Sequence, residues 1–448
     1  MKLPLKPDQV TKAAGLLVGG TALGQVVLLL ALPFLTRLYS PEYFNTLAIY
    51  VAIIGIFSGA ICLRFDIAIS LPEPSDEGWR LMILSISCAA IFSSLVAAGL
   101  ALLLWSFAIN VGVESYLFSM MVGLGLFSVG AFNSLQMWYV REKNFLSISF
   151  VKFSQSIAVV SIQIGAGIWL ATAAGLLWGQ LASGVVGAFA FFVLLGKSPR
   201  SWSALSFQDV RRFFKIYGRF PRYSVFESLA NEAASQLPLL LIAFLLGGAE
   251  AGYLMLAMKV LQAPIALLGN AISQVYLSQA PLSERKGELA ALSKNMLSRL
   301  AKVGIGPLLF AAIVAPTVFP VVFGSEWQRA GELVSWMTPW FIFQLLVSPI
   351  SMSLHVKGKQ DIALYLQLSS LLMRVSAVLL FYFFFRDFMV EAYALSGFVS
   401  YLLYFFVVLK VLGVSINTLV DLFAEASLYV LPLICFAFIF LWAVSFFS

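Results

Sequence analysis

The sequence predicts an all-α, polytopic membrane protein with 12–13 transmembrane helices. Of the 448 residues, 61% are hydrophobic and 11% are charged, and the charged share is about half of that in a soluble globular protein. Uncharged runs recur along the whole chain at close to the roughly 20 residues that a membrane-spanning helix needs. A transmembrane barrel would instead show shorter segments of alternating polarity. The composition therefore excludes a soluble domain and favours a helical bundle.

The individual spans follow from the apolar runs and the short charged segments between them. The last run is the one whose membrane crossing the sequence leaves open, since twelve spans leave the C-terminus in the cytoplasm and thirteen place it outside. The predicted spans are 13–35, 44–63, 81–108, 115–139, 150–170, 172–196, 223–246, 251–276, 303–323, 333–354, 362–385, 389–411 and 428–447.

The distribution of basic residues orients these spans. We expect an uncleaved first span and a cytoplasmic N-terminus in a bacterial inner membrane. The chain has 28 Lys and Arg residues, and with this orientation nearly all of them fall on the cytoplasmic side, as the positive-inside rule requires. The exceptions are Arg37, Arg329 and Arg386 in outer loops and Lys259 and Arg374 within spans.

The chain is predicted to contain two similar halves. We assign an N-terminal six-helix bundle to 1–196, a basic cytoplasmic linker to 197–221, a C-terminal six-helix bundle to 222–412 and an extra segment to 413–448. Residues 35–48 resemble 244–257, since both segments place Glu, then Tyr, then Leu-Ala after the first span of a half. The shared topology predicts a parallel pseudo-repeat around a central cavity.

The linker is predicted to contain a basic amphipathic helix. Its basic side chains, among them Arg211, Arg212 and Lys215, favour contact with the anionic lipids of the cytoplasmic leaflet. A solvated linker is the alternative interpretation. The apolar residues that approximate one helical face are Trp202, Leu205, Val210, Phe213, Phe214 and Tyr217.

The seventh span is the most polar. Its stripe of polar side chains cannot face lipid, and it lines either a watery cavity or a tight helix contact. Two carboxylates in one span favour the cavity, because each needs water or a cation. The residues on or next to the stripe are Ser224, Glu227, Ser228, Asn231, Glu232 and Ser235.

Other polar side chains within spans have two interpretations each. Arg374 and Lys259 would bind an anionic head group or pair with Glu227 or Glu232. Arg64 and Asp66 close the second span, where charged side chains commonly extend to the membrane surface. Asn133 and Gln136 share one face of the fourth span, either as cavity lining or as polar contacts between helices.

Motifs for enzymatic chemistry are missing. Gly196-Lys-Ser198 ends like a phosphate-binding loop, but Phe191 occupies the position of the first glycine. A single histidine excludes a zinc HExxH site, and no nucleophile elbow is present. Cys62, Cys88 and Cys435 show no ligand spacing. We therefore expect no cofactor, no metal, no nucleic-acid partner and no enzymatic activity.

Three strings resemble the polysaccharide flippases of the multidrug/oligosaccharidyl-lipid/polysaccharide (MOP) exporter superfamily. They are the segments 63–73, 217–224 and 252–276, and the resemblance covers essentially residues 1–412. It implies that the protein flips an undecaprenyl-diphosphate-linked oligosaccharide from the cytoplasmic to the outer leaflet, in concert with a polysaccharide polymerase and export machinery. Two alternatives remain: a drug/cation antiporter of the same superfamily and a membrane-embedded sugar-polymer enzyme.

The resemblance also implies roles for the polar residues within the spans. Arg374, Lys259 and Arg64 are expected to contact the diphosphate. A second set is expected to line the cavity, where its members would bind sugar hydroxyls or a coupling ion. This set is Glu227, Asn231, Glu232, Asp66, Ser228, Asn133 and Gln136.

Overall fold

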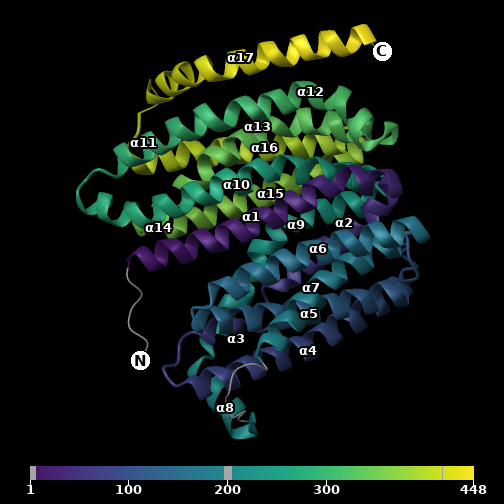
Figure 1. The fold of residues 1–448 in the computed structure, drawn as a ribbon, viewed down its shortest axis with the longest axis vertical. Helices are drawn as coiled ribbons and strands as arrows, with labels where there is room; N and C mark the ends of the chain where they lie inside the picture. The colour runs from purple at the N-terminus through teal and green to yellow at the C-terminus, as the bar shows by residue number, and fades with distance from the viewer. Residues whose placement is uncertain (1–6, 196–203, 416, 448) are drawn as a thin grey trace. The chain divides into compact units, whose positions relative to one another are not determined.

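The computed structural model describes residues 7–195, 204–415 and 417–447, and within these ranges every regular element is a helix (Figure 1). The chain divides into two compact units, Met1–Leu240 and Leu241–Ser448. Each unit is described separately below. The all-α prediction is therefore confirmed for the described residues.

The N-terminal unit is a bundle of long apolar helices. Helix α1 packs on α6 and α6 on α7, while α5 packs on α4 and α7 and α2 contacts both α5 and α7. The elements are α1 (Pro7–Leu38), α2 (Pro41–Ser58), α3 (Phe65–Ala68), α4 (Ser75–Ser106), α5 (Ser115–Arg141), α6 (Phe145–Trp169), α7 (Ala173–Leu195), α8 (Phe207–Ile216), the π-helical turn η1 (Phe220–Ser224) and most of α9 (Val225–Leu246).

One hydrophobic core joins the short helices α3 and α8 to this bundle. Phe65 of α3, Trp138 of α5, Phe191 of α7 and Phe213 of α8 belong to the same buried cluster, and none of them is more than 2% exposed. The structure has a helix, α8, within the predicted linker, and Phe213 on its apolar face packs on protein. The expectation that this face lies on the lipid leaflet is wrong for Phe213, and Trp202 lies outside the described residues.

The C-terminal unit is built around α13, which packs on α10, α12 and α16, while α15 packs on α16. The elements are α10 (Glu250–Arg285), α11 (Leu289–Leu300), the π-helical turn η2 (Ala301–Ile305), α12 (Gly306–Phe323), the 3₁₀ turn η3 (Ser325–Trp327), α13 (Gln328–Ile350), α14 (Met352–Val356), α15 (Gln360–Phe384), the 3₁₀ turn η4 (Arg386–Phe388), α16 (Met389–Leu412) and α17 (Asn417–Phe447).

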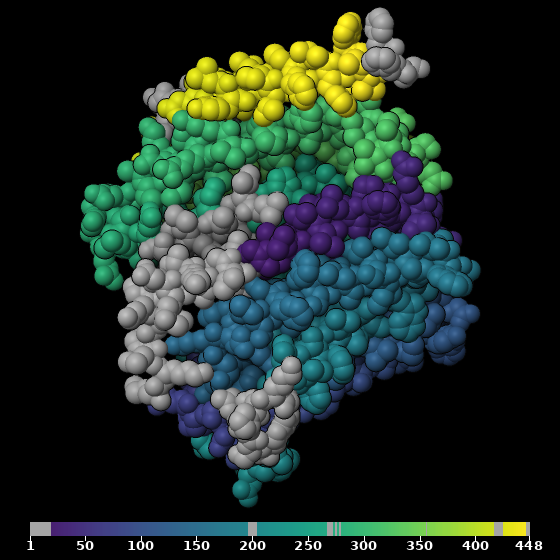
Figure 2. Space-filling model, in the orientation of Figure 1, coloured from purple at the N-terminus to yellow at the C-terminus, as the bar shows by residue number. Residues whose placement is uncertain are grey.

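Helix α17 packs along α12 of this unit. In Figure 2 it is the yellow segment beside the green helices. Phe436 stacks on Phe310 with ring centroids 5.9 Å apart. A side chain at Gly306 would collide with Leu433, so the glycine allows the two helices to approach closely. Lys302 Nζ and Glu425 Oε2 form an ion pair of 2.8 Å. The extra C-terminal segment is therefore a helix that packs on the bundle.

Twelve helices of the described residues are long and apolar enough to cross a membrane, and the protein is a multi-pass membrane protein. They include Ala424–Val444, which corresponds to the predicted thirteenth span. The predicted span at 251–276 corresponds to α10, which continues to Arg285. The boundaries differ most before residue 303, because α11, η2 and α12 form one continuous helical run that starts at Leu289.

The division between the units also differs from the predicted one. The sequence places it in the linker 197–221, whereas the compact units divide within α9, after Leu240. The physical reason is local packing. Phe213 is buried in the N-terminal core, and a Cβ atom added at Gly55 or Gly59 of the α2 region would meet Gln236 or Ser228 of α9.

Candidate functional site

The irregular segment between α2 and α3 contains the first polar group of the candidate site. Helix α2 ends at Ser58, and α3 begins only at Phe65. Between them Leu63 and Arg64 adopt left-handed backbone conformations, with φ of 51° and 60°. Each such conformation costs about 1–3 kcal/mol for a residue other than glycine, and strain of this kind concentrates at functional positions.

Arg64, Asp66 and Ser228 carry buried polar atoms in this region. Asp66 is 8% exposed and Ser228 is 5% exposed. Arg64 Nε and Asp66 Oδ1 are buried without a hydrogen-bond partner among the described residues. A Cβ atom added at Gly59 would lie against Ser228 Oγ and 3.9 Å from Arg64 Nη1. The structure therefore brings Arg64 close to Ser228, two of the residues predicted for the site.

The polar stripe of α9 divides between two environments. Glu227 and Asn231 are exposed and Glu232 is half-buried, and such side chains on a membrane helix need water or a polar partner. Ser228 instead faces Gly59. The helix-contact interpretation therefore holds for Ser228, and cavity lining stays a prediction for the exposed side chains of the stripe.

The remaining predicted residues are half-buried. Asn133 and Gln136 lie on α5 of the N-terminal unit, and Lys259 lies on α10 of the C-terminal unit. Among the described residues of the C-terminal unit, Lys259 forms no ion pair within 4.0 Å.

Arg374 occupies an aromatic cage within the C-terminal unit. Its guanidinium carbon lies 4.5 Å from the ring centroid of Trp340 and 5.6 Å from that of Tyr401. The cage thus combines one residue of α15 with residues of α13 and α16. Arg374 is 7% exposed, so in this conformation it lies between helices of its own unit. The sequence predicted that it binds an anionic head group or pairs with Glu227 or Glu232.

The cage contains several hydrogen-bonding atoms that are not satisfied. Arg374 Nε, Trp340 Nε1 and Tyr393 Oη are buried without a hydrogen-bond partner in the described part of the chain. Tyr393 lies edge-on to Trp340, with ring centroids 5.3 Å apart. Unpaired buried polar groups cost about 1–3 kcal/mol each, more when they are charged. The cage therefore has N–H and O–H groups available for an acceptor such as a phosphate oxygen.

The sequence indicated Arg374 but none of its aromatic partners. Trp340 and Tyr401 lie in apolar spans rich in aromatic residues, where nothing distinguishes them from lipid-facing side chains. Gly397 supplies a local signal that becomes clear only in three dimensions, because a Cβ atom there would collide with the Trp340 ring. The missing side chain lets the indole approach α16 closely.

The docking of α8 is electrostatic as well as hydrophobic. Arg80 Nη1 contacts Asp209 Oδ1 at 3.1 Å, and Tyr217 Oη donates to Glu77 Oε1 at 3.2 Å. Hydrogen bonds from Ser206, together with the Arg80 guanidinium, hold the pKa of Asp209 below its usual range. Burial, followed by the Glu77 carboxylate, raises the pKa of Tyr217. The basic side chains Arg211, Arg212 and Lys215 remain exposed.

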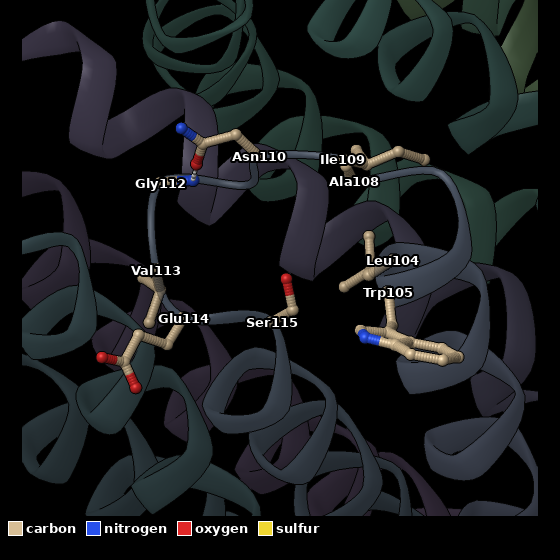
Figure 3. A pocket seen from close by; sticks show the side chains of 9 residues that line it. All are labelled: Leu104, Trp105, Ala108, Ile109, Asn110, Gly112, Val113, Glu114 and Ser115. Carbon is tan, nitrogen blue, oxygen red and sulfur yellow. Dashed lines mark hydrogen bonds between the residues drawn. The ribbon is translucent and has the colours of Figure 1, made fainter.

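A surface pocket of about 790 Å³ lies at the turn between α4 and α5 (Figure 3). Asn110 Oδ1 accepts a hydrogen bond of 2.8 Å from the backbone of Gly112 and shapes the turn. The pocket contains none of the predicted site residues. Its lining consists of Leu104, Trp105, Ala108, Ile109, Asn110, Gly112, Val113, Glu114 and Ser115.

Solved structures with the same fold are transporters. The chain matches the lipid II flippase MurJ in an inward closed conformation at 14% identity, covering 96% of this chain and 98% of that chain, with a TM-score of 0.66. An inward-facing MATE multidrug transporter matches at 13% identity over 87% and 94% of the two chains, with a TM-score of 0.63. A MOP-superfamily transporter from Pyrococcus furiosus matches at 13% identity over 90% and 96%, with a TM-score of 0.53.

The fold is therefore that of the MOP-superfamily transporters. No curated protein matches the chain. A family model described as polysaccharide biosynthesis protein matches residues 34–332, more than half of the chain. The chain belongs to this family, as the resemblance of its sequence predicted.

Proposed function

We propose that the protein flips an undecaprenyl-diphosphate-linked oligosaccharide from the cytoplasmic to the periplasmic leaflet of a bacterial inner membrane by alternating access. Its N-terminus lies in the cytoplasm. The flipped cargo is then used by a polysaccharide polymerase and export machinery. Membership of the polysaccharide biosynthesis family and the transporter fold support this proposal. The exposed polar side chains of α9 supply hydrogen bonds to sugar hydroxyls.

The proposal depends on the buried charge of Arg374. Its guanidinium is buried on a membrane helix, and within the described residues of its unit no carboxylate lies within 4.0 Å of it. A charge at this depth costs at least about 2.5–3.5 kcal/mol on insertion scales. A cargo diphosphate would neutralise it, since guanidinium and phosphate form strong paired hydrogen bonds. The cage is closed here, so Trp340 or Tyr401 must move when the cargo binds.

The other cations would guide the diphosphate. In this proposal Arg64 meets it near the cytoplasmic end of α2, and Lys259 contacts it within the C-terminal unit. Export of an anion from an inside-negative cell is favoured by about 2.3 kcal/mol per charge at 100 mV. The membrane potential would therefore assist transport even without a coupling ion.

The experiment is complementation of a deletion strain. We expect the deletion to accumulate lipid-linked precursor on the cytoplasmic side and the wild-type gene to restore polymer at the cell surface. Arg374→Ala should fail to restore polymer at an unchanged protein level, and Arg374→Lys should restore it in part. Wild-type polymer from Arg374→Ala would refute the assignment of Arg374.

A drug/cation antiporter is the second candidate. Asp66 of the N-terminal unit has a buried carboxyl oxygen without a hydrogen-bond partner among the described residues, and MATE transporters share the fold. The same strains separate the two functions. If the protein is an antiporter, deletion of its gene would leave polymer export unchanged and raise the sensitivity of the cells to cationic drugs. Asp66→Asn would then reproduce the drug sensitivity of the deletion.

A further inference from the structure

Three glutamates surround one arginine where α10, α13 and α16 begin. Arg329 contacts Glu391 through Nη2 at 2.5 Å, Glu332 through Nη1 at 3.4 Å and Glu250 through Nε at 3.7 Å. We call these four residues the Arg329 cluster. It ties three helices of the C-terminal unit together and uses none of the residues assigned to the cargo.

The cluster has too few positive charges for its carboxylates. With all groups ionised, one guanidinium would face three carboxylates. Glu391 Oε2 and Glu250 Oε2 are buried without a hydrogen-bond partner in the described part of the chain, and the Glu391 side chain is 10% exposed. Like charges at close range disfavour full ionisation.

Neighbouring elements do not supply the missing charge. The charged side chains that act on Glu250 and Arg329 are those of the cluster itself. Arg386 of η4 donates instead to the carbonyl oxygen of Leu245 at 2.9 Å. The positive ends of the helix dipoles of α10 and α16 compensate in part, since Glu250 and Glu391 lie in the first turns of these helices.

A proton fits the cluster better than a metal ion. Within the described residues, no group of three or more acidic, histidine or cysteine side chains has an arrangement that could hold a metal ion. A proton needs only one carboxylate oxygen, and the two oxygens without a hydrogen-bond partner among the described residues provide it. Glu332, whose side chain is 40% exposed, gives the cluster access to water.

We propose that the Arg329 cluster is a proton-binding site in which the three glutamates together hold one proton. When the proton adds to a carboxylate oxygen, a neutral carboxyl forms and the excess negative charge around Arg329 falls. Loss of the proton restores the third carboxylate and increases repulsion between the starts of α10 and α16. The site would therefore couple the packing of these helices to the proton concentration.

The described residues of the N-terminal unit show no matching cluster at the corresponding glutamate of the sequence repeat. That glutamate is Glu42, one position out of register with Glu250, and it is exposed on α2. No described ion pair contains Glu42. Glu42 therefore provides a matched control.

Infrared difference spectroscopy of the full-length protein in liposomes tests the proposal without any cargo. A protonated carboxyl has a carbonyl stretch that shifts in D₂O, whereas a carboxylate does not have this band. At neutral pH we expect the carboxyl band of the wild type to be larger than that of Glu250→Gln and that of Glu391→Gln. Each difference should equal the amplitude of one carboxyl group. Two variants are used so that the test survives if one of them fails to fold.

The controls fix the interpretation. Glu42→Gln should leave the band unchanged. Asp66→Asn removes any contribution from the other buried carboxyl, and the loss caused by Glu391→Gln should persist in that background. An unchanged band in every folded variant of Glu250 and Glu391 would overturn the proposal, because the cluster would then be a fully ionised structural contact.

Discussion

At the residue scale, Gly59 sets the approach of α9 to the α2 region. A Cβ atom there would collide with the Ser228 hydroxyl, and at Gly55 it would lie 3.0 Å from Gln236 Cγ. Two small residues four positions apart allow membrane helices to pack closely. The same contact holds Ser228 beside Arg64, so the glycine positions one member of the candidate site.

Gly59→Ala should therefore destabilise the protein by about 1–3 kcal/mol, the usual cost of an overpacked contact. The added methyl group collides with Ser228 Oγ, so Ser228→Ala in the same chain should recover most of the loss. Thermal unfolding in detergent measures both effects. Gly99→Ala is the matched control, because nothing lies within 4 Å of a Cβ atom at Gly99. Equal midpoints for Gly59→Ala and Gly99→Ala would contradict this account.

Single residues also show where sequence reasoning ends. Arg374 was recognisable because a charge within an apolar span is unusual. Its contacts with Trp340 and Tyr401 were not, since they join three helices that are far apart in sequence. The Arg329 cluster was missed for the same reason, because Glu250, Arg329 and Glu391 each resemble an ordinary loop charge.

At the element scale, α8 shows how composition can indicate a helix and still mislead about its partner. Its apolar periodicity and its capping box at Ser206 specify the helix. The same apolar face would suit a lipid surface, but Phe213 is 1% exposed in the core of the N-terminal unit. Only the positions of α3, α4 and α5 decide between the two surfaces.

The ion pairs of α8 predict a dependence on pH. Because the folded pKa of Asp209 is lowered, its charge stabilises α8 above its usual pKa of about 4, and this contribution is lost as the pH falls through the folded value. Asp209→Asn should weaken docking by about 0.2–1 kcal/mol at neutral pH. Amide hydrogen exchange of residues 207–216 measures the weakening.

The difference between wild type and Asp209→Asn should shrink as the pH falls below about 4. Glu114→Gln is the control, because this residue lies at the turn between α4 and α5, at the other end of α4 from Glu77 and Arg80, which contact α8. Equal protection of α8 in wild type and Asp209→Asn at neutral pH would show that Asp209 does not contribute to docking.

At the scale of the whole molecule, the sequence predicted the helical fold, the family and nearly all of the spans, because each depends on local hydrophobicity over about 20 residues. The helix ends were less predictable. Helix α10 continues past its apolar run to Arg285, and the run from Leu289 to Phe323 begins with polar turns that hydropathy excludes. Which side chains meet across helices could not be inferred, since apolar spans offer no periodic pattern that selects a partner.

For the whole transporter, we predict that water contacts the polar side of α9. Glu227→Cys should react with a charged, membrane-impermeant thiol reagent, because a thiolate forms only in contact with water. Phe226→Cys, at the neighbouring exposed apolar position, should react far more slowly, because lipid covers it. The measurement uses protein whose native Cys62, Cys88 and Cys435 are replaced by alanine. Equal reaction at the two positions would contradict a water-lined face.

The most direct test of the central claim is transport by purified protein in liposomes. A fluorescent lipid-diphosphate-linked oligosaccharide is supplied, and its appearance in the opposite leaflet is followed with an external quencher. We predict flipping by the wild type and a rate at least about tenfold lower for Arg374→Ala, since a lost charge-assisted contact is worth about 1.5–3 kcal/mol. Arg386→Ala, a change in the turn η4, should flip at the wild-type rate. Equal rates for Arg374→Ala and wild type, or no flipping by the wild type, would contradict the account.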